Sequence, residues 1–249
     1  MNISVMKIFL LLLASLLASG ANADDLRKIA VLALMGDTLT LVNHRPETGS
    51  NIDRNLYSSV PTSASAIDNM LATEVIEATQ RVGLPGNLEI QAVKYPGRYE
   101  TARWFNGAKF TPPAELALAM TQLEATHLLF IAPYRAPSML KTANSSVGSG
   151  HLEGLGFYID RELRIKRADT GELGQGVLAP FAYFKVWLID LARGERVHEQ
   201  AITASSTASV ARNKNGLDPW DTLDAAQKVL ALRRLIRSEL DMALPKLLP

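Results

Sequence analysis

Four histidines and the acids near them are the first places to look for chemistry in this chain of 249 residues. They are His44, His127, His151 and His198, and no two form a His-x-x-x-His pair. A metal site would therefore need several of them, or acids, to converge in space. His127 begins an apolar run and is typical of a core or edge residue. His151 follows a loop of small residues and precedes Glu153, so this pair is a candidate site, with a solvated loop histidine as the alternative.

Thr38 is the second candidate for chemistry. The block Gly36-Asp-Thr-Leu39 resembles the Gly-Asp-Ser-Leu block of the SGNH hydrolases, with Thr38 at the position of the nucleophile. Such a nucleophile needs a histidine oriented by an acid, which that family supplies as Asp-x-x-His near the carboxyl end. In this chain the last histidine is His198, and the residue three positions before it is Glu195, so the corresponding pattern is Glu-x-x-His. The apolar alternation on both sides of Gly36 and Asp37 favours a β-hairpin turn instead.

The composition excludes several other chemistries. The chain has no cysteine, which excludes a disulfide framework, a thiolate zinc site and a cysteine nucleophile. With 26 Lys+Arg against 25 Asp+Glu, the net charge of +1 gives no general basic field for nucleic acids. The glycines at 148–150 and 154–156 match neither the dinucleotide fingerprint nor a P-loop. We predict no cofactor, no metal site and no nucleic-acid partner.

Residues 1–23 have the three parts of a secretory signal peptide. Lys7 precedes the apolar run Ile8–Leu17, and Ala21-Asn-Ala23 matches a cleavage site. The run falls short of the ~20 residues that span a bilayer, and no later apolar stretch is long enough either. We predict cleavage after Ala23 and release of residues 24–249 into the periplasm. Since there is no cysteine, we predict no lipid anchor on the mature chain.

The mature chain alternates predicted strands and helices. We predict strands at 28–34, 38–42, 88–93, 127–132, 156–159, 163–166, 181–191 and 197–202, and helices at 63–82 and 111–123. A long last helix is predicted to open at Asp218-Pro219 and to end at Pro245, and the polar stretch 43–61 is predicted to be an exposed loop. Alternation in the first half predicts parallel strands, and the later consecutive strands predict an antiparallel extension. We therefore expect a single α/β domain with a mixed sheet, helices packed on it and a long carboxyl-terminal helix.

Three segments in this order resemble a group of cell-envelope proteins. They are Ile29-Ala-Val-Leu32, Ala125-Thr-His-Leu-Leu-Phe-Ile131 and Val186-Trp-Leu-Ile-Asp-Leu-Ala-Arg-Gly-Glu195. The group contains the curli secretion lipoprotein, the penicillin-binding-protein activator lipoproteins and the amino-terminal domain of TolB, the Tol-Pal translocation protein. Its lipoprotein members carry a lipid-bearing cysteine, which this chain lacks. The resemblance spans residues 29–244 and implies a binding or assembly role in the envelope, without assigning any binding residue.

These observations lead to one leading hypothesis and two alternatives. The first is a non-enzymatic periplasmic protein that binds another envelope protein. The second is a periplasmic hydrolase of SGNH-like type that uses Thr38 or residues around His151. The third is a small-ligand carrier whose lid is the loop at 134–150, which is rich in small polar residues and is predicted to be mobile.

Overall fold

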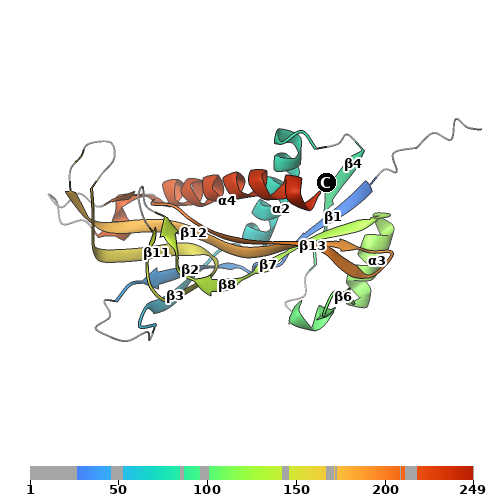
Figure 1. Ribbon diagram of the computed structural model, residues 1–249, viewed down its shortest axis with the longest axis horizontal. Helices are drawn as coiled ribbons and strands as arrows, with labels where there is room; N and C mark the ends of the chain where they lie inside the picture. Colours follow the sequence, from blue (N-terminus) through green and yellow to red (C-terminus); the bar gives the residue numbers. More distant parts are fainter. Residues whose placement is uncertain are drawn as a thin grey trace, which may run out of the picture.

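The computed structural model describes residues 27–45, 53–84, 87–95, 101–141, 146–166, 171, 173–207, 209–210 and 218–248. The predicted signal peptide at 1–23 lies outside these residues and stays a prediction. In the described part of the chain, a large mixed sheet carries two helices, α2 (Ala66–Arg81) and α4 (Ala225–Leu247), on the same face (Figure 1). The predicted fold class is confirmed. No described helix combines the length and the apolar character needed to cross a membrane.

The sheet is built around two long neighbouring strands, β11 (His151–Lys166) and β12 (Leu173–Asp190), which pair antiparallel. The shorter elements are β1 (Arg27–Ala33), β2 (Thr38–Asn43), β3 (Leu56–Pro61), β4 (Leu88–Ala92), η1 (Thr101–Trp104), β5 (Phe105–Asn106), β6 (Lys109–Phe110), α3 (Ala114–Gln122), β7 (His127–Pro133), β8 (Arg135–Pro137), β9 (Leu140–Lys141), β10 (Ser146–Val147), β13 (Glu195–Ser205), β14 (Ser209–Val210) and η3 (Pro219–Thr222). Gly194, with φ 59°, closes the predicted hairpin between β12 and β13.

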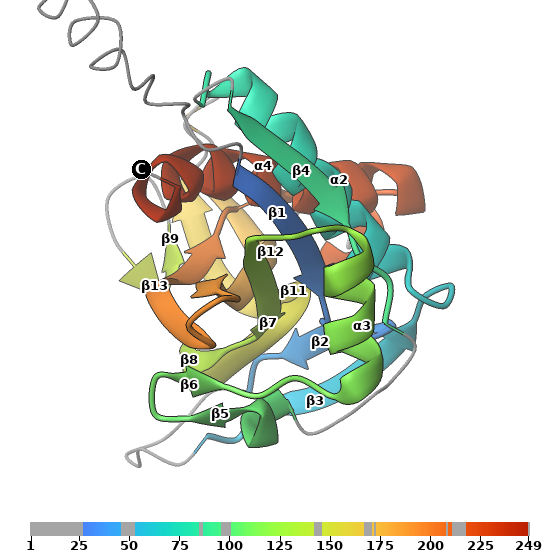
Figure 2. The ribbon, with the colours of Figure 1, turned by 90° about the vertical axis from the view of Figure 1, so that its right-hand side faces the viewer.

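The sheet branches at β12. Beyond β11 come β2, in parallel, and then β3, antiparallel to β2. The second half of β12 pairs antiparallel with β7, from which β1 and β4 continue in parallel, side by side in Figure 2. The parallel first half and the antiparallel extension are thus both confirmed.

Strands β1 and β7 are buried on both faces, as the continuous apolar run of β7 predicts. Ile29 and Val31 face the cluster formed by α2 and α4, whereas Ala30 and Leu32 belong to the cluster that α3 covers. Leu128 and Phe130 of β7 join the α3 cluster in the same alternation. The region around β1 and β7 is therefore three layers thick, and it holds the ends of its strands in fixed positions.

The predicted hairpin at Gly36-Asp37 is wrong. β1 pairs with β4 and β7, whereas β2 pairs with β11 and β3, so the two strands do not pair with each other. They run in the same direction, and the chain passes from one branch of the sheet to the other through Leu34–Asp37. The alternation of apolar and polar residues indicates that both runs are strands, but it does not indicate with which other strands they pair.

The prediction of an exposed loop at 43–61 is also wrong in its second half, because Leu56–Pro61 forms the strand β3. β3 is an outer strand with mostly exposed side chains, so it lacks the apolar alternation by which a strand is recognised. Likewise, the predicted loop at 134–150 contains the short strands β8, β9 and β10, and β8 pairs with β11. Residues 142–145 of that loop lie outside the described residues.

Both predicted ends of the last helix are wrong. Asp218 caps the short helix η3, its carboxylate accepting the Trp220 N–H, and α4 begins at Ala225. The cap of α4 is Asp224, which exchanges hydrogen bonds with Gln227 in a capping box. Pro245 lies inside α4, which continues to Leu247, because a proline removes only one backbone donor and the buried Leu244 and Leu247 keep the last turn packed.

Candidate binding cleft

A cleft of about 1020 Å³ lies where β1, β4 and β7 end. It is lined by the connection Leu34–Asp37, by the first residues of α2 with the turn before it, by Tyr95 after β4, and by side chains of β7, β11 and β12. The carboxyl ends of parallel strands are the common place for ligands in open α/β sheets, since loops and helix starts converge there. The cleft is therefore the first candidate for a functional site.

Aromatic rings form one wall of the cleft. Phe130 and Trp187 are cross-strand partners on β7 and β12, and their rings stack with centroids 5.3 Å apart. Phe105 packs against both rings, 5.7 Å from Trp187 and 5.9 Å from Phe130. The indole N–H of Trp187 donates to Glu199 at 3.2 Å, which fixes the orientation of the ring. This wall is therefore apolar and held in place from two strands.

Three carboxylates, those of Asp37, Asp68 and Glu153, also line the cleft. Asp68 Oδ1 accepts the backbone N–H of Met35 at 2.7 Å, so its carboxylate is held against the connection between β1 and β2. Glu153 lies 3.9 Å from the guanidinium of Arg135, and both side chains are largely exposed. The described lining contains no lysine or arginine. Carboxylates and aromatic faces both attract cations, so a lining that combines them favours a ligand with a cationic group.

Only one of the three predicted site residues lines this cleft. Glu153 does, next to residues from β1 and α2 that the sequence did not connect with it. Thr38 begins β2 opposite Pro61, and within the described residues its hydroxyl makes no hydrogen bond to a histidine. His151, at the start of β11, is exposed and is held through its backbone. Catalytic roles for Thr38 and His151 stay predictions.

A polar cluster missed by the sequence analysis surrounds His44. Its Nδ1 lies 2.8 Å from the Tyr158 hydroxyl and 3.2 Å from Ser149 Oγ, and its Nε2 lies 3.8 Å from Asp160 Oδ2. A serine, a histidine and an acid can make a nucleophile, but the Tyr158 hydroxyl is the nearest group to Nδ1. The ring thus joins the end of β2 to β11 and to the turn before it. Residues 44 and 149 are too far apart in sequence for their spacing to indicate this.

A second part of the same region centres on Asp53. Its carboxylate accepts hydrogen bonds from the Tyr57 hydroxyl and, at 3.1 Å each, from the backbone N–H groups of Asn55 and His151. Gly150 packs so closely that a Cβ there would lie 2.4 Å from the carboxylate. Partial burial raises the pKa of Asp53, but these hydrogen bonds outweigh it and hold the pKa below its ordinary value.

We expect the stabilising effect of Asp53 to depend on pH. Because its pKa is lower in the folded state, the ionised carboxylate stabilises the fold at neutral pH and loses this effect as the pH falls through the folded pKa. Asp53→Asn should lower the urea midpoint at pH 7, and the difference from wild type should narrow at acidic pH. The exposed acid Glu162 provides the control, Glu162→Gln. An equal difference at both pH values would contradict this prediction.

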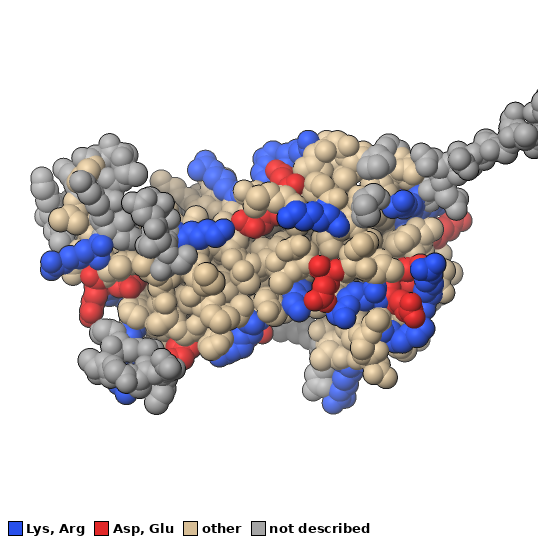
Figure 3. Space-filling view, viewed as in Figure 1, with Lys and Arg blue, Asp and Glu red and all other residues tan. Residues whose placement is uncertain are grey.

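Charges on the visible face of the molecule are mixed in sign. In Figure 3, lysines and arginines alternate with acids around a broad uncharged area, without forming a single-sign patch on this side. Such a surface gives little long-range steering for a strongly charged partner.

Comparisons with known proteins give distant likenesses among solved structures. No family model matches the sequence, and no curated protein matches it. Among solved structures, protein XCC0632 from Xanthomonas campestris, described under the family DUF330, has a TM-score of 0.42 and 10% identity, over 89% of this chain and 83% of that one. The hypothetical protein CT253 from Chlamydia trachomatis has a TM-score of 0.36 and 12% identity, over 89% and 98%. A PelC dodecamer from Paraburkholderia phytofirmans has a TM-score of 0.31 and 14% identity, over 90% and 89%. At these scores the likenesses establish neither a family nor a function, and membership of the curli and TolB group stays a prediction.

Proposed function

We propose that this protein is a non-enzymatic binding protein of the cell envelope, which holds a segment of another envelope protein in the cleft. The observation that carries the proposal is the combination of a stacked aromatic wall with three carboxylates in one cleft. The bound segment would carry a basic side chain next to an aromatic or aliphatic one, because this combination is complementary to the lining of the cleft. The signal sequence at 1–23 supports action in the periplasm.

The lining favours recognition over chemistry. Aromatic side chains are the commonest anchors of protein interfaces, since they bury a large area with little loss of conformational freedom. A cation over an aromatic face gains about 0.5–2 kcal/mol, depending on how far it is desolvated. The carboxylates add attraction that selects basic over acidic partners. Together these groups bind a side chain tightly without needing a nucleophile.

The size and position of the cleft favour a protein segment over a small molecule. Its volume of about 1020 Å³ lies at the upper end of small-molecule pockets, about 300–1,000 Å³. Its lining also includes Tyr95, which lies just after β4, and the only described neighbour of β4 in the sheet is β1. The outer edge of β4 therefore offers backbone groups to an extended partner segment, a common way of binding peptides.

The proposal predicts selective binding of basic aromatic peptides. We would titrate the purified mature protein with short Arg-Phe-containing peptides and with matched Glu-Phe peptides, following tryptophan fluorescence and calorimetry. The Arg-Phe peptide should bind at least about tenfold more tightly, and added salt should reduce the difference. Trp187→Ala should weaken binding by about 30-fold, the loss typical of an aromatic anchor, and Glu153→Gln should weaken it less.

Trp220→Ala is the matched control, because Trp220 lies on η3, away from the cleft lining. It removes the same side chain and should leave peptide affinity unchanged. Equal affinity for the two peptides, or equal effects of the two tryptophan variants, would refute the proposal.

A further inference from the structure

A smaller pocket adjoins the cleft, between the first residues of α2 and the end of β4, and is called the side pocket below. Its volume is about 220 Å³. Ser65, Asp68 and Tyr95 line both the cleft and the side pocket, so they form the border between the two. The side pocket is completed by Ala33, Asn69, Ala72, Ala92, Val93 and Lys94. A partner segment that lies on the aromatic wall of the cleft can therefore continue past Tyr95 into the side pocket.

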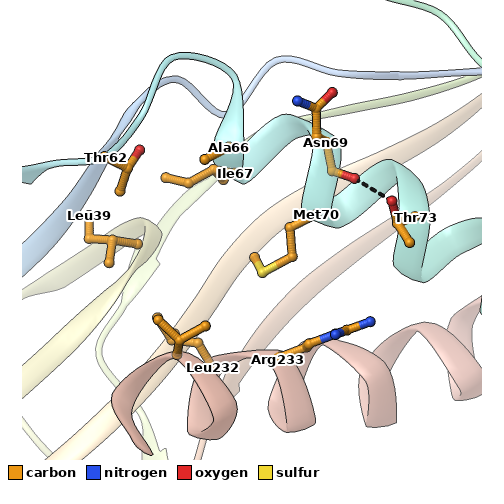
Figure 4. A pocket seen from close by; sticks show the side chains of 10 residues that line it. Leu39, Thr62, Ala66, Ile67, Asn69, Met70, Thr73, Leu232 and Arg233 are labelled. Carbon is orange, nitrogen blue, oxygen red and sulfur yellow. Dashed lines mark hydrogen bonds between the residues drawn. The ribbon is translucent and has the colours of Figure 1, made fainter. Parts of the chain in front are cut away.

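Two exposed polar side chains of the side pocket, those of Asn69 and Lys94, make no hydrogen bond or ion pair with any described residue. Asn69 also lines a groove between α2 and α4, drawn in Figure 4. There Met70 points from α2 toward Leu232 of α4, whereas the Asn69 amide points away from α4. Within the described part of the chain, the amide of Asn69 and the ammonium group of Lys94 are thus both open to a ligand.

These two groups determine which chemistry fits the side pocket. A ligand that covered them without pairing them would leave polar groups unsatisfied, which is costly, so an apolar occupant does not fit. The Asn69 amide has both donors and an acceptor, and it can therefore pair with the N–H and C=O groups of a peptide main chain. The ammonium group of Lys94 has donors only, and its strongest partner is a carboxylate.

The charge of the lining changes sign along this path. The carboxylates of Asp37 and Glu153 lie in the cleft, and that of Asp68 lies at the border. Lys94 lies beyond the border and is the one cation that lines the side pocket among the described residues. A segment that is complementary to both parts carries charges of both signs in a fixed order.

We infer that the partner segment carries an acidic side chain in addition to its basic and aromatic ones, and that this acid pairs with Lys94 in the side pocket. The basic and aromatic side chains lie in the cleft, and Asn69 binds the main chain that joins them to the acid. This inference rests on the function proposed above and adds to it the order of charges along the segment.

The first test varies the position of the acid. Arg-Phe peptides, acetylated and amidated at their ends, would carry Glu about two to four residues before or after the Arg-Phe pair, and matched peptides would carry Gln there. By calorimetry, Glu should bind about two- to fivefold more tightly than Gln at one of these positions, as expected for an exposed ion pair, and added salt should remove the difference.

This test separates the inference from the proposed function. If Arg-Phe peptides bind selectively but Glu is never better than Gln, the inference is wrong and the proposed function stands. If Arg-Phe peptides do not bind more tightly than Glu-Phe peptides, the proposed function fails, and the inference fails with it.

The second test reverses the charge in the side pocket. Lys94→Glu should abolish the advantage of the Glu peptide and should instead favour a peptide with Lys at the same position, by a similar factor. Lys246→Glu is the control, because Lys246 is an exposed lysine in the last turn of α4, outside both linings, and the change in net charge is the same. Equal effects of the two substitutions on the ratio of Glu to Gln affinities would overturn the inference.

The third test concerns the main chain of the segment. Asn69→Ala should weaken the Glu and Gln peptides by the same factor, about fivefold, because the lost hydrogen bonds go to a part that both peptides share. Thr73→Ala, at an exposed position of α2 outside both linings, should leave both affinities unchanged. Circular dichroism of both variants checks the fold. Unchanged affinity of Asn69→Ala, or a loss confined to one peptide, would overturn the role of Asn69.

Discussion

Replacing Gly156 by alanine is expected to disrupt the sheet. Gly156 lies on β11 between Thr40 of β2 and Phe181 of β12, and an added Cβ would lie 1.8 Å from the Thr40 carbonyl oxygen. The same Cβ would lie 2.8 Å from the Phe181 ring. A backbone oxygen in a paired strand cannot turn aside as a flexible side chain can, so β2 and β11 would have to separate. We expect a loss of about 4 kcal/mol or more, a large part of the total stability of a typical protein.

Urea unfolding followed by circular dichroism measures this loss, and Gly154→Ala is its control. Gly154 lies on the same strand with φ 72°, and a Cβ there would have no neighbour within 4 Å. That variant carries only the strain of a left-handed conformation, about 1–2 kcal/mol. If Gly156→Ala cost no more than Gly154→Ala, the close approach of β2 to β11 would be wrong.

The second large effect is expected at the ion pairs that join α2 to α4. Arg81 of α2 donates to Asp241 of α4 from Nε at 3.1 Å and from Nη2 at 2.8 Å. Nη2 also lies 3.6 Å from Glu74, which is only 1% exposed. Arg81→Met removes one of the two cations that face this buried carboxylate among the described residues, and it leaves Asp241 without its bidentate partner. Since unbalanced buried charges are costly, we expect a loss of about 3 kcal/mol.

A double-mutant cycle tests whether the loss comes from the buried carboxylate. In the variant with both Arg81→Met and Glu74→Leu, the acid has gone together with its cation, so part of the stability should return. Arg81→Lys should recover little, because an ammonium group cannot make the bidentate contact. A loss below about 1 kcal/mol for Arg81→Met, as at exposed ion pairs, would show that these charges are well solvated.

The sequence was enough to predict most of the fold because the signals were local. The apolar run at 127–132 and the spaced apolar residues of 63–82 mark β7 and α2 without knowledge of their neighbours. Pairing is different, because it depends on contacts between distant segments. The alternation around Gly36 therefore suggested a hairpin, although β1 and β2 belong to different branches of the sheet. β3 was missed because its side chains are mostly exposed.

Less of the candidate cleft could be predicted. Glu153 was singled out for its place beside a loop of small residues, but its neighbours Asp37 and Asp68 come from segments more than 80 residues away. Trp187 lies in the predicted strand 181–191, but its ring packs on Phe130 and also lines the cleft. No sequence spacing indicates such a partly buried position. The groove between α2 and α4 has no sequence signal at all, because aliphatic residues of helices usually indicate core.

The connection between β1 and β2 constrains how this chain can change over evolution. At one end Ile29 is in register with His127, and at the other Thr40 is in register with Gly156. Inserting or deleting one residue within Leu34–Asp37 would shift β2 by one position and turn Leu39 and Leu41 to the opposite face of the sheet. The number of residues in this connection is therefore constrained by the register of β2, while the identity of Asp37 is constrained by the cleft that it lines.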